Sequence, residues 1–188
     1  MIELKKATIE EIDDVIALHN KYHIFTILEE DKKDGFVTTA FTYEELKDLI
    51  EKEEGLFIAK KDDKVIAYIM SASWEFWSAW PMFEYMIKHL EENQFLNQKL
   101  TTNNSYQYGP ICIDKDYRGT TLLLDLFEFA RINMSKRFPI LVTFINKINT
   151  RSFEAHTRKL KLEVINEFEY CGKNYYELCY DTSKSVFA

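Results

Sequence analysis

Two stretches of the chain place polar residues directly after apolar runs. Residues Asn149–His156 follow the apolar run 140–145, and residues Arg118–Leu123 follow the apolar run 111–113. If each run is a strand and each polar stretch begins a helix, unpaired N–H groups from two helix starts lie near two strand ends. Such groups attract anions, so the pattern favours a site for a phosphate-bearing cofactor.

The first of these stretches also contains a residue that can exchange protons. His156 is the side-chain type that titrates near neutral pH and serves most often as an acid or base. A histidine on a helix can equally be a hydrogen-bonded packing residue, and both roles stay open at this point. Ser152 is interpreted as a polar residue at a helix start, because no Gly-x-Ser-x-Gly pattern surrounds it.

The rest of the chain predicts the elements that position these stretches. Thr8 with Glu11 and Thr42 with Glu45 are capping-box pairs at helix starts. Gly55 is expected to end the second helix. The predicted strands are 2–6, 56–60, 65–73, 106–113, 140–145, 162–168 and 175–180, and the predicted helices begin near residues 8, 42, 81, 121 and 150.

The element order predicts an α/β (α+β) fold in which a mixed sheet of about seven strands is flanked by helices on both faces. Residues 22–41 read as a loop with an extra turn of helix. Pro81 is expected to begin a helix that runs to about Gln98, because proline is favoured at the first helical position.

Composition narrows the class of protein. A chain of 188 residues with 46% hydrophobic and 29% charged residues predicts a single globular domain, 1–188. The net charge of −7 disfavours nucleic acid and anionic membranes as partners and favours cationic small molecules. The three cysteines have neither metal-ligand spacing nor an even count for a disulfide framework. We therefore expect a cytoplasmic protein without a metal, and no run is long enough to span a membrane.

The strand–turn–helix at 106–135 and the strand–helix–hairpin at 140–180 resemble the GCN5-related N-acetyltransferases (GNAT). The resemblance covers nearly the whole chain except an aromatic-rich insert at about 75–104. It implies the acyl-CoA N-acyltransferase fold, acetyl-CoA as cofactor, and transfer of an acetyl group to an amine of a small molecule or protein.

The family binds the coenzyme A diphosphate with the turn after its fourth strand, which carries the pattern Gln/Arg-x-x-Gly-x-Gly/Ala. The matching residues here are Arg118, Gly119, Thr120, Thr121, Leu122 and Leu123. Thr121 stands where the family has its first glycine, and Leu123 stands where the family has glycine or alanine. A threonine at a position that requires positive φ would cost about 1–2 kcal/mol and weaken the site.

The resemblance implies further site residues. Ile111, Cys112 and Ile113 match the strand edge that pairs with the pantetheine arm, and Asn149 and Ser152 complete the cofactor set. His156 falls where many members carry a tyrosine that protonates the leaving thiolate.

The insert is expected to shape the choice of acceptor. Glu75 is the carboxylate that we would test first as the base for the acceptor amine. Trp74, Trp77, Tyr106 and Tyr108 are the expected acceptor contacts, since aromatic faces attract cationic amines. Aromatic residues at this spacing can equally form a hydrophobic lid, a core or a contact in a homodimer.

Three functions remain open from the sequence. The first is an N-acetyltransferase that positions an amine against the cofactor thioester. The second is a degenerate member that binds an acyl-CoA, or no cofactor, and acts in regulation or partner binding. The third is a structural partner protein that uses the aromatic insert as its contact surface.

Overall fold

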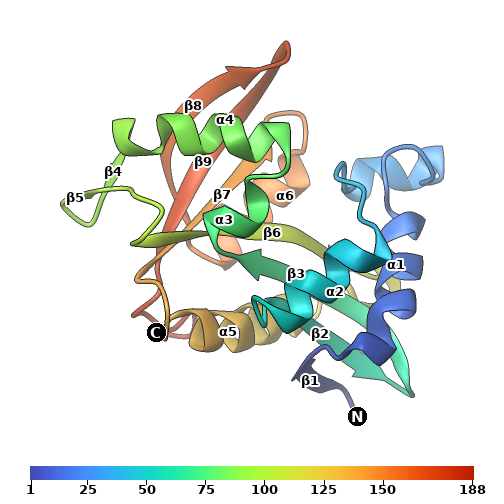
Figure 1. Cartoon of the computed structure of the whole chain (residues 1–188). Coiled ribbons are helices and arrows are strands. Elements are labelled where there is room, and N and C mark those ends of the chain that lie inside the picture. The colour runs from blue at the N-terminus through green and yellow to red at the C-terminus, as the bar shows by residue number, and fades with distance from the viewer. The chain divides into compact units, whose positions relative to one another are not determined.

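The computed structural model describes residues 1–188, which form two compact units, each built from two segments of the chain. The first unit comprises Met1–Ser71 and Gly109–Ala130, and the second comprises Ala72–Tyr108 and Arg131–Ala188. A mixed seven-stranded sheet with the order β1-β2-β3-β6-β7-β9-β8 is flanked by helices (Figure 1). The predicted fold class is confirmed, and the prediction of a single domain stays untested.

The first unit contains antiparallel strands covered by helices. Its elements are β1 (Glu3–Lys6), the 3-10 turn η1 (Ile9–Glu11), α1 (Ile12–Lys21), the 3-10 helix η2 (Glu29–Asp34), α2 (Tyr43–Glu51), β2 (Leu56–Lys61), β3 (Lys64–Ala72), the second half of β6 (Ser105–Ile113), the 3-10 turn η4 (Lys115–Tyr117) and the start of α5 (Leu122–Met134). The extra helical turn expected within 22–41 is η2.

Local sequence explains most of these boundaries. Thr42 accepts a hydrogen bond from Glu45 N–H at 3.2 Å while Glu45 Oε2 accepts from Thr42 N–H at 2.9 Å, so the predicted capping box begins α2. Residues of α1 and α2 such as Ile12 and Leu46 are fully buried. The ring of Phe129 in α5 packs edge-on against Phe57 in β2, with 6.0 Å between centroids.

The role predicted for Gly55 needs a correction. The helix α2 already ends at Glu51, and the left-handed residue after it is Glu54, with φ of 50°. Gly55 is required for space instead, because a Cβ atom there would lie 1.8 Å from the carbonyl oxygen of Ser71. The glycine thus permits the close approach in which Ser71 N–H donates to the Gly55 carbonyl at 2.8 Å.

The second unit combines the insert with the C-terminal part of the chain. Its elements are α3 (Trp74–Trp77), α4 (Pro81–His89), the 3-10 turn η3 (Leu90–Glu92), β4 (Gln94–Phe95), β5 (Gln98–Lys99), the first half of β6, β7 (Ile140–Asn146), α6 (Thr150–Glu154), the π-helical turn η5 (Ala155–Lys159), β8 (Glu163–Tyr170) and β9 (Lys173–Asp181). Strand β6 pairs in parallel with β7 from Ser105↔Ile140 to Gln107↔Val142. Strands β8 and β9 form the predicted final hairpin.

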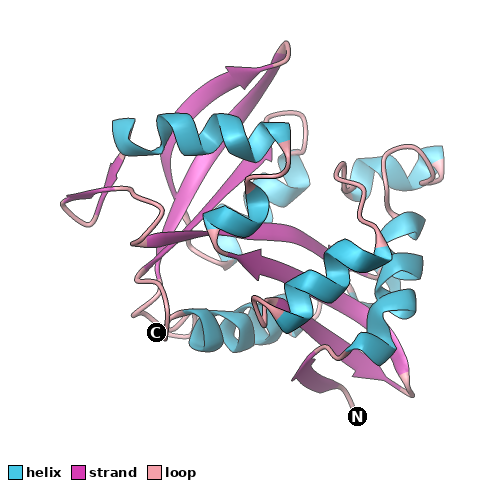
Figure 2. Ribbon diagram, in the orientation of Figure 1, coloured by secondary structure: helices cyan, strands magenta, loops and turns pink.

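The predicted helix from Pro81 to about Gln98 is wrong in its second half. It ends at His89, and the chain then forms the small hairpin of β4 and β5 (Figure 2). The turn residues Leu96 and Asn97 both have positive φ, at 53° and 59°, which suits a tight two-residue hairpin turn. The hairpin buries Phe95, which is 8% exposed.

Candidate functional site

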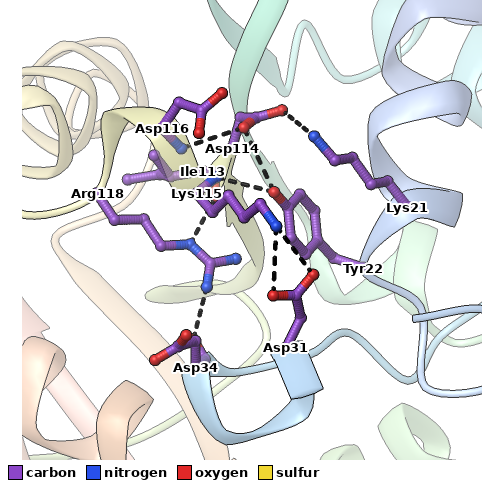
Figure 3. Close-up of polar contacts among 9 residues, drawn as sticks. All are labelled: Lys21, Tyr22, Asp31, Asp34, Ile113, Asp114, Lys115, Asp116 and Arg118. Atoms are coloured by element: carbon purple, nitrogen blue, oxygen red, sulfur yellow. Dashed lines mark hydrogen bonds and ion pairs between the residues drawn. The ribbon is translucent and has the colours of Figure 1, made fainter. Parts of the chain in front are cut away.

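The stretch 118–123 is predicted to bind the cofactor and is called the cofactor loop below; Arg118 holds it in place. Arg118 donates from Nε to the carbonyl of Ile113 at 2.8 Å and from a terminal guanidinium nitrogen to the carbonyl of Asp34 at 2.8 Å (Figure 3). Its guanidinium also lies 4.7 Å from the ring centroid of Tyr22, a cation–π distance. The side chain therefore joins the end of β6 to the segment between α1 and α2.

Tyr22 and Asp114 continue this polar network. The Tyr22 hydroxyl accepts a hydrogen bond from Lys115 N–H at 2.8 Å and donates to Asp114 at 3.4 Å (Figure 3). Burial raises the pKa of Asp114, but the hydrogen bonds from Lys21, at 2.7 Å, and from Asp116 N–H outweigh it and lower the pKa below its usual value. The residues before the cofactor loop are thus held by charge-assisted contacts.

The residue of the loop with positive φ is a glycine, which adopts this conformation without strain. Gly119 has φ of 80°, and no atom lies within 4 Å of the position that a Cβ would occupy. Thr121 is not among the residues with positive φ, so the strain predicted there is absent. The Thr121 hydroxyl donates to Asp125 at 2.8 Å, and the Thr120 hydroxyl donates to the Tyr117 carbonyl at 2.7 Å.

The loop leads into a helix start with unpartnered donors. The first helical hydrogen bond of α5 joins Asp125 N–H to the Thr121 carbonyl at 3.0 Å, and Leu122 N–H is held by the Thr120 hydroxyl at 3.3 Å. The N–H groups of Leu123 and Leu124 make no hydrogen bond within the chain. Together with the open space at Gly119, these donors fit a diphosphate, because a helix start carries partial positive charge.

The end of β6 is only partly available to a ligand. Cys112 is 5% exposed, and burial raises the pKa of its thiol to about 12, so the side chain is a neutral packing group. Ile111 and Ile113 are half-buried. The Ile113 carbonyl accepts from Arg118, and β6 pairs with β3 along one edge, so pairing of this strand end with a pantetheine arm stays a prediction.

In the second unit, the polar stretch 149–156 begins a short helix as expected. Asn149 Oδ1 accepts a hydrogen bond from Ser152 N–H at 3.2 Å and caps α6. Ser152 is half-buried, and its hydroxyl lies 3.3 Å from His156 Nδ1. Both side chains have local structural roles, and their predicted cofactor contacts stay predictions.

His156 is a buried, neutral histidine with a defined tautomer. It is 4% exposed, and burial lowers the pKa of its imidazole. Nδ1 lies 2.7 Å from the Ser152 carbonyl oxygen, which can only accept, so Nδ1 carries the proton and Nε2 carries the lone pair. A neutral ring of this kind accepts a proton at Nε2, whereas protonating a thiolate from that atom would require the cationic form.

The expected acceptor residues lie in the core of the second unit. Trp74 and Trp77 are fully buried, and their indole N–H groups donate to Ser105 Oγ at 3.0 Å and to the Gln107 carbonyl at 3.1 Å. This burial favours the packing alternative for the tryptophans, and it leaves their acceptor role untested.

The two tyrosines and Glu75 complete that predicted set. Tyr106 and Tyr108 are each 1% exposed, and burial raises the pKa of both phenols. The Tyr108 carbonyl accepts a hydrogen bond from Thr143 Oγ1 at 2.7 Å. The Tyr108 ring packs edge-on against the His156 ring, with 5.7 Å between the centroids. Glu75 is exposed in the first turn of α3.

Sequence reasoning missed two groups of residues. Tyr22 and Asp34 both lie in the segment 22–41, which is predicted from the sequence to be mostly a loop. Asp34 contacts Arg118 through its backbone carbonyl, and such a contact leaves no signal in the sequence. The buried Glu177 of β9 was also missed. Its only sequence signal is a single carboxylate placed between Tyr176 and Leu178 in an otherwise apolar strand.

Comparison with known proteins identifies the fold. No protein-family model and no curated protein sequence matches the chain. Solved structures do match over nearly its whole length. An N-acetyltransferase from Staphylococcus aureus has a TM-score of 0.61 at 15% identity, covering 97% of this chain and 99% of that one.

Two further solved structures also match nearly the whole chain. YncA from Salmonella typhimurium, solved with its cofactor acetyl-CoA, has a TM-score of 0.63 at 10% identity and covers 96% of this chain and 94% of its own. The ribosomal-protein-S18-alanine N-acetyltransferase of Escherichia coli has a TM-score of 0.58 at 12% identity, with 98% and 96% covered. The chain therefore has the acyl-CoA N-acyltransferase fold, and the resemblance to GNAT proteins is confirmed at the level of the fold.

Proposed function

We propose that the chain is an acetyl-CoA-dependent N-acetyltransferase whose acceptor is an amine of a small molecule or protein. The observation that carries the proposal is the start of α5, where Gly119 leaves open space and the N–H groups of Leu123 and Leu124 have no partner within the chain. These groups would hold the diphosphate of the cofactor. The bound cofactor would supply an acetyl thioester.

The residues before the helix start would keep these donors in place. Arg118 is committed to two backbone carbonyls, so it acts as a clamp on the loop rather than as a free cation for the phosphates. Among the predicted cofactor residues, Ile111 would pair with the pantetheine arm through its backbone, and the Thr120 and Thr121 hydroxyls hold the loop through hydrogen bonds to Tyr117 and Asp125.

Proton transfer from the acceptor amine needs a base. His156 is suited to it, because its Nε2 lone pair accepts a proton while Nδ1–H stays on the Ser152 carbonyl. The exposed carboxylate of Glu75 is the alternative. Replacing each residue in turn distinguishes the two. If His156 is the base, His156→Gln should abolish the rise of kcat with increasing pH. If Glu75 is the base, Glu75→Gln should abolish it instead.

Matched variants at Thr120 test the cofactor site. Thr120→Asp keeps an oxygen that can accept from Leu122 N–H but adds a negative charge at the helix start, whereas Thr120→Asn has nearly the same shape without the charge. An exposed charge pair at ~4 Å contributes about 1 kcal/mol in water, so two phosphate charges predict about 2 kcal/mol of lost acetyl-CoA affinity in the Asp variant. The Asn variant should bind like the wild type.

Calorimetry and thermal unfolding with and without acetyl-CoA give the readout. At a cofactor concentration of about 100 times Kd, binding stabilises the folded chain by about 2.7 kcal/mol. The negative charge itself favours the helix start, so Thr120→Asp should fold normally without cofactor. Equal affinity of the Asp and Asn variants would refute the site, and no stabilisation of the wild type would refute acetyl-CoA as the cofactor.

A binding module without catalysis is the alternative, and Leu123 is the remaining feature that favours it, because a half-buried leucine stands where the family has glycine or alanine. Release of free thiol from acetyl-CoA across a panel of amines separates the two functions. Binding without thiol release would select the module. The cytoplasmic location and a homodimer stay predictions, and no helix of the chain is long and apolar enough to cross a membrane.

A further inference from the structure

A pocket in the second unit is not accounted for by acetyl transfer. It has a volume of about 330 Å³ and is lined by residues of the insert helix α4, the following turn η3 and the strands β8 and β9. Figure 1 shows where α4, β8 and β9 lie in the second unit. Its size falls at the lower end of the range for small-molecule sites. Residues that line it include Tyr85, His89, Glu92, Asn166 and Glu177.

The inner wall of the pocket carries a buried carboxylate. Glu177 is 4% exposed and accepts a hydrogen bond from the Asn93 side-chain amide at 3.1 Å. The side chain of Asn166 also hydrogen-bonds to it. Its partners are thus neutral amides, which orient the carboxylate without neutralising its charge.

The titratable side chains that line the pocket beside Glu177 come from three elements, α4, η3 and β8. His89 of α4 lines the pocket, and its Nδ1 lies 2.9 Å from a carboxylate oxygen of Glu92 in η3. Glu167 of β8 also lines the pocket and forms an ion pair with Lys147. Burial raises the pKa of Glu177 to about 7, and the Asn166 hydrogen bond and His89 only partly oppose that rise. The nearby thiol of Cys179 is buried and neutral, because burial raises its pKa as well.

The walls of the pocket are aromatic. The Tyr85 ring lies 4.5 Å from the His89 ring and 5.9 Å from the Phe168 ring, measured between centroids. Tyr170 packs against Tyr85 at 5.0 Å. Aromatic faces beside carboxylates are the surroundings that attract organic ammonium groups. A metal ion fits less well, because no group of three or more His, Cys, Asp or Glu side chains in the chain could hold one.

We propose that this pocket binds a small organic cation with a primary ammonium group, for which Glu177 is the charged anchor and Tyr85 the aromatic wall. The proposal goes beyond acetyl transfer, because binding here requires neither acetyl-CoA nor a reaction. A ligand of this class also suits the net charge of −7.

Titration calorimetry without acetyl-CoA tests the site. The probes are 1,4-diaminobutane and its neutral counterpart 1,4-butanediol, each at up to millimolar concentration. The diamine should bind and the diol should not. Glu177→Gln should weaken diamine binding by about tenfold or more, because it removes the charged partner of a buried hydrogen bond. Glu163→Gln, which removes the same charge from β8 outside the pocket, should leave binding within about twofold.

The pH dependence gives a second readout. Glu177 binds a cation in its ionised form, so diamine affinity should rise with pH through about 7 and fall by roughly tenfold between pH 8 and pH 5.5. This dependence should vanish in Glu177→Gln.

Two results would overturn the proposal: no diamine binding to the wild type, or equal binding to the wild type and Glu177→Gln. If Glu177→Gln does not fold, Tyr85→Leu decides, because losing the ring should weaken binding several-fold and unchanged affinity would exclude the pocket. Since acetyl-CoA is absent throughout, failure here leaves the proposed acetyl transfer untouched.

Discussion

The buried carboxylate of Glu11 should make a large contribution to the stability of the first unit. It is 4% exposed and accepts hydrogen bonds from Lys5 Nζ at 2.7 Å, Thr8 N–H at 2.7 Å and the Thr8 hydroxyl at 2.9 Å, with Lys60 Nζ at 3.3 Å. Lys5 lies in β1 and Lys60 in β2, so this carboxylate joins both strands to the start of α1.

The size of the contribution follows from the pKa of Glu11. Burial raises that pKa, but the hydrogen bonds from Lys5, Thr8 and Lys60 lower it by more, from 4.5 to about 2. The difference corresponds to about 3 kcal/mol of folding free energy. Because the folded pKa is below the unfolded one, this stability is fully present above pH 4.5 and is lost as the pH falls toward 2.

Glu11→Gln keeps the length and an acceptor for Thr8 N–H but removes the charge that faces the two lysines. At pH 7 we expect a loss of about 2–3 kcal/mol in the free energy of unfolding, equivalent to a Tm lower by about 5–10 °C for a chain of this size. Urea unfolding at a series of pH values from 7 to 3 measures it. The gap between wild type and variant should narrow below pH 4.5.

Glu10→Gln is the matched control, because Glu10 is an exposed neighbour in the same turn. It should change stability by no more than about 0.5 kcal/mol. The reasoning would be refuted if Glu11→Gln cost no more than Glu10→Gln, or if the gap between wild type and Glu11→Gln stayed constant down to pH 3.

Further predictions concern strain and thiol reactivity. Lys161 is exposed with φ of 60°, so Lys161→Gly should stabilise the chain by about 1 kcal/mol in urea unfolding, whereas Lys159→Gly in the preceding helical turn should destabilise it by a similar amount. If Lys161→Gly destabilised the chain as much as Lys159→Gly does, the backbone at 161 would not be strained. Cys171 is exposed, whereas Cys112 and Cys179 are buried and burial raises the pKa of both thiols. A thiol reagent should therefore modify one cysteine per folded chain and all of them in denaturant, and fast reaction of more than one in the folded chain would contradict the burial.

The sequence predicts the fold well where the deciding interactions are local. The capping box of Thr42 and Glu45 begins α2 as expected, and the last two strands form the expected hairpin, with Cys171 and Gly172 in its turn. These features depend on residues within a few positions of one another, so their signal is complete in a short window.

The insert shows where local reasoning fails. The sequence predicts a helix from Pro81 to about Gln98, yet the helix ends at His89 and a short hairpin follows, whose surroundings include distant residues. The side chain of Asn93 bonds to Glu177, which lies more than eighty residues away, and Phe95 is buried in the second unit. Gly55 is a similar case, since its requirement for a missing Cβ comes from Ser71 in another strand. Such contacts are invisible until the topology is known.

Some features of the candidate site can likewise be predicted from the sequence, and others cannot. The position of the cofactor loop at a strand-to-helix junction follows from the sequence, as does the polar helix start at Asn149. The protonation state of His156 does not, because it depends on burial and on the Ser152 carbonyl. The clamp of Arg118 on Asp34 likewise uses a backbone atom that any residue would supply.

The geometry of the cofactor loop bears directly on the choice between enzyme and degenerate module. Thr121 would strain the loop only if the backbone at this position required positive φ. The loop instead has its left-handed residue at Gly119, and Thr121 uses its hydroxyl to hold Asp125. A substitution of glycine by threonine is costly only where the backbone requires glycine. The departure from the family pattern at Thr121 therefore brings no strain from positive φ, and Leu123 is the departure that still favours the hypothesis of a degenerate site.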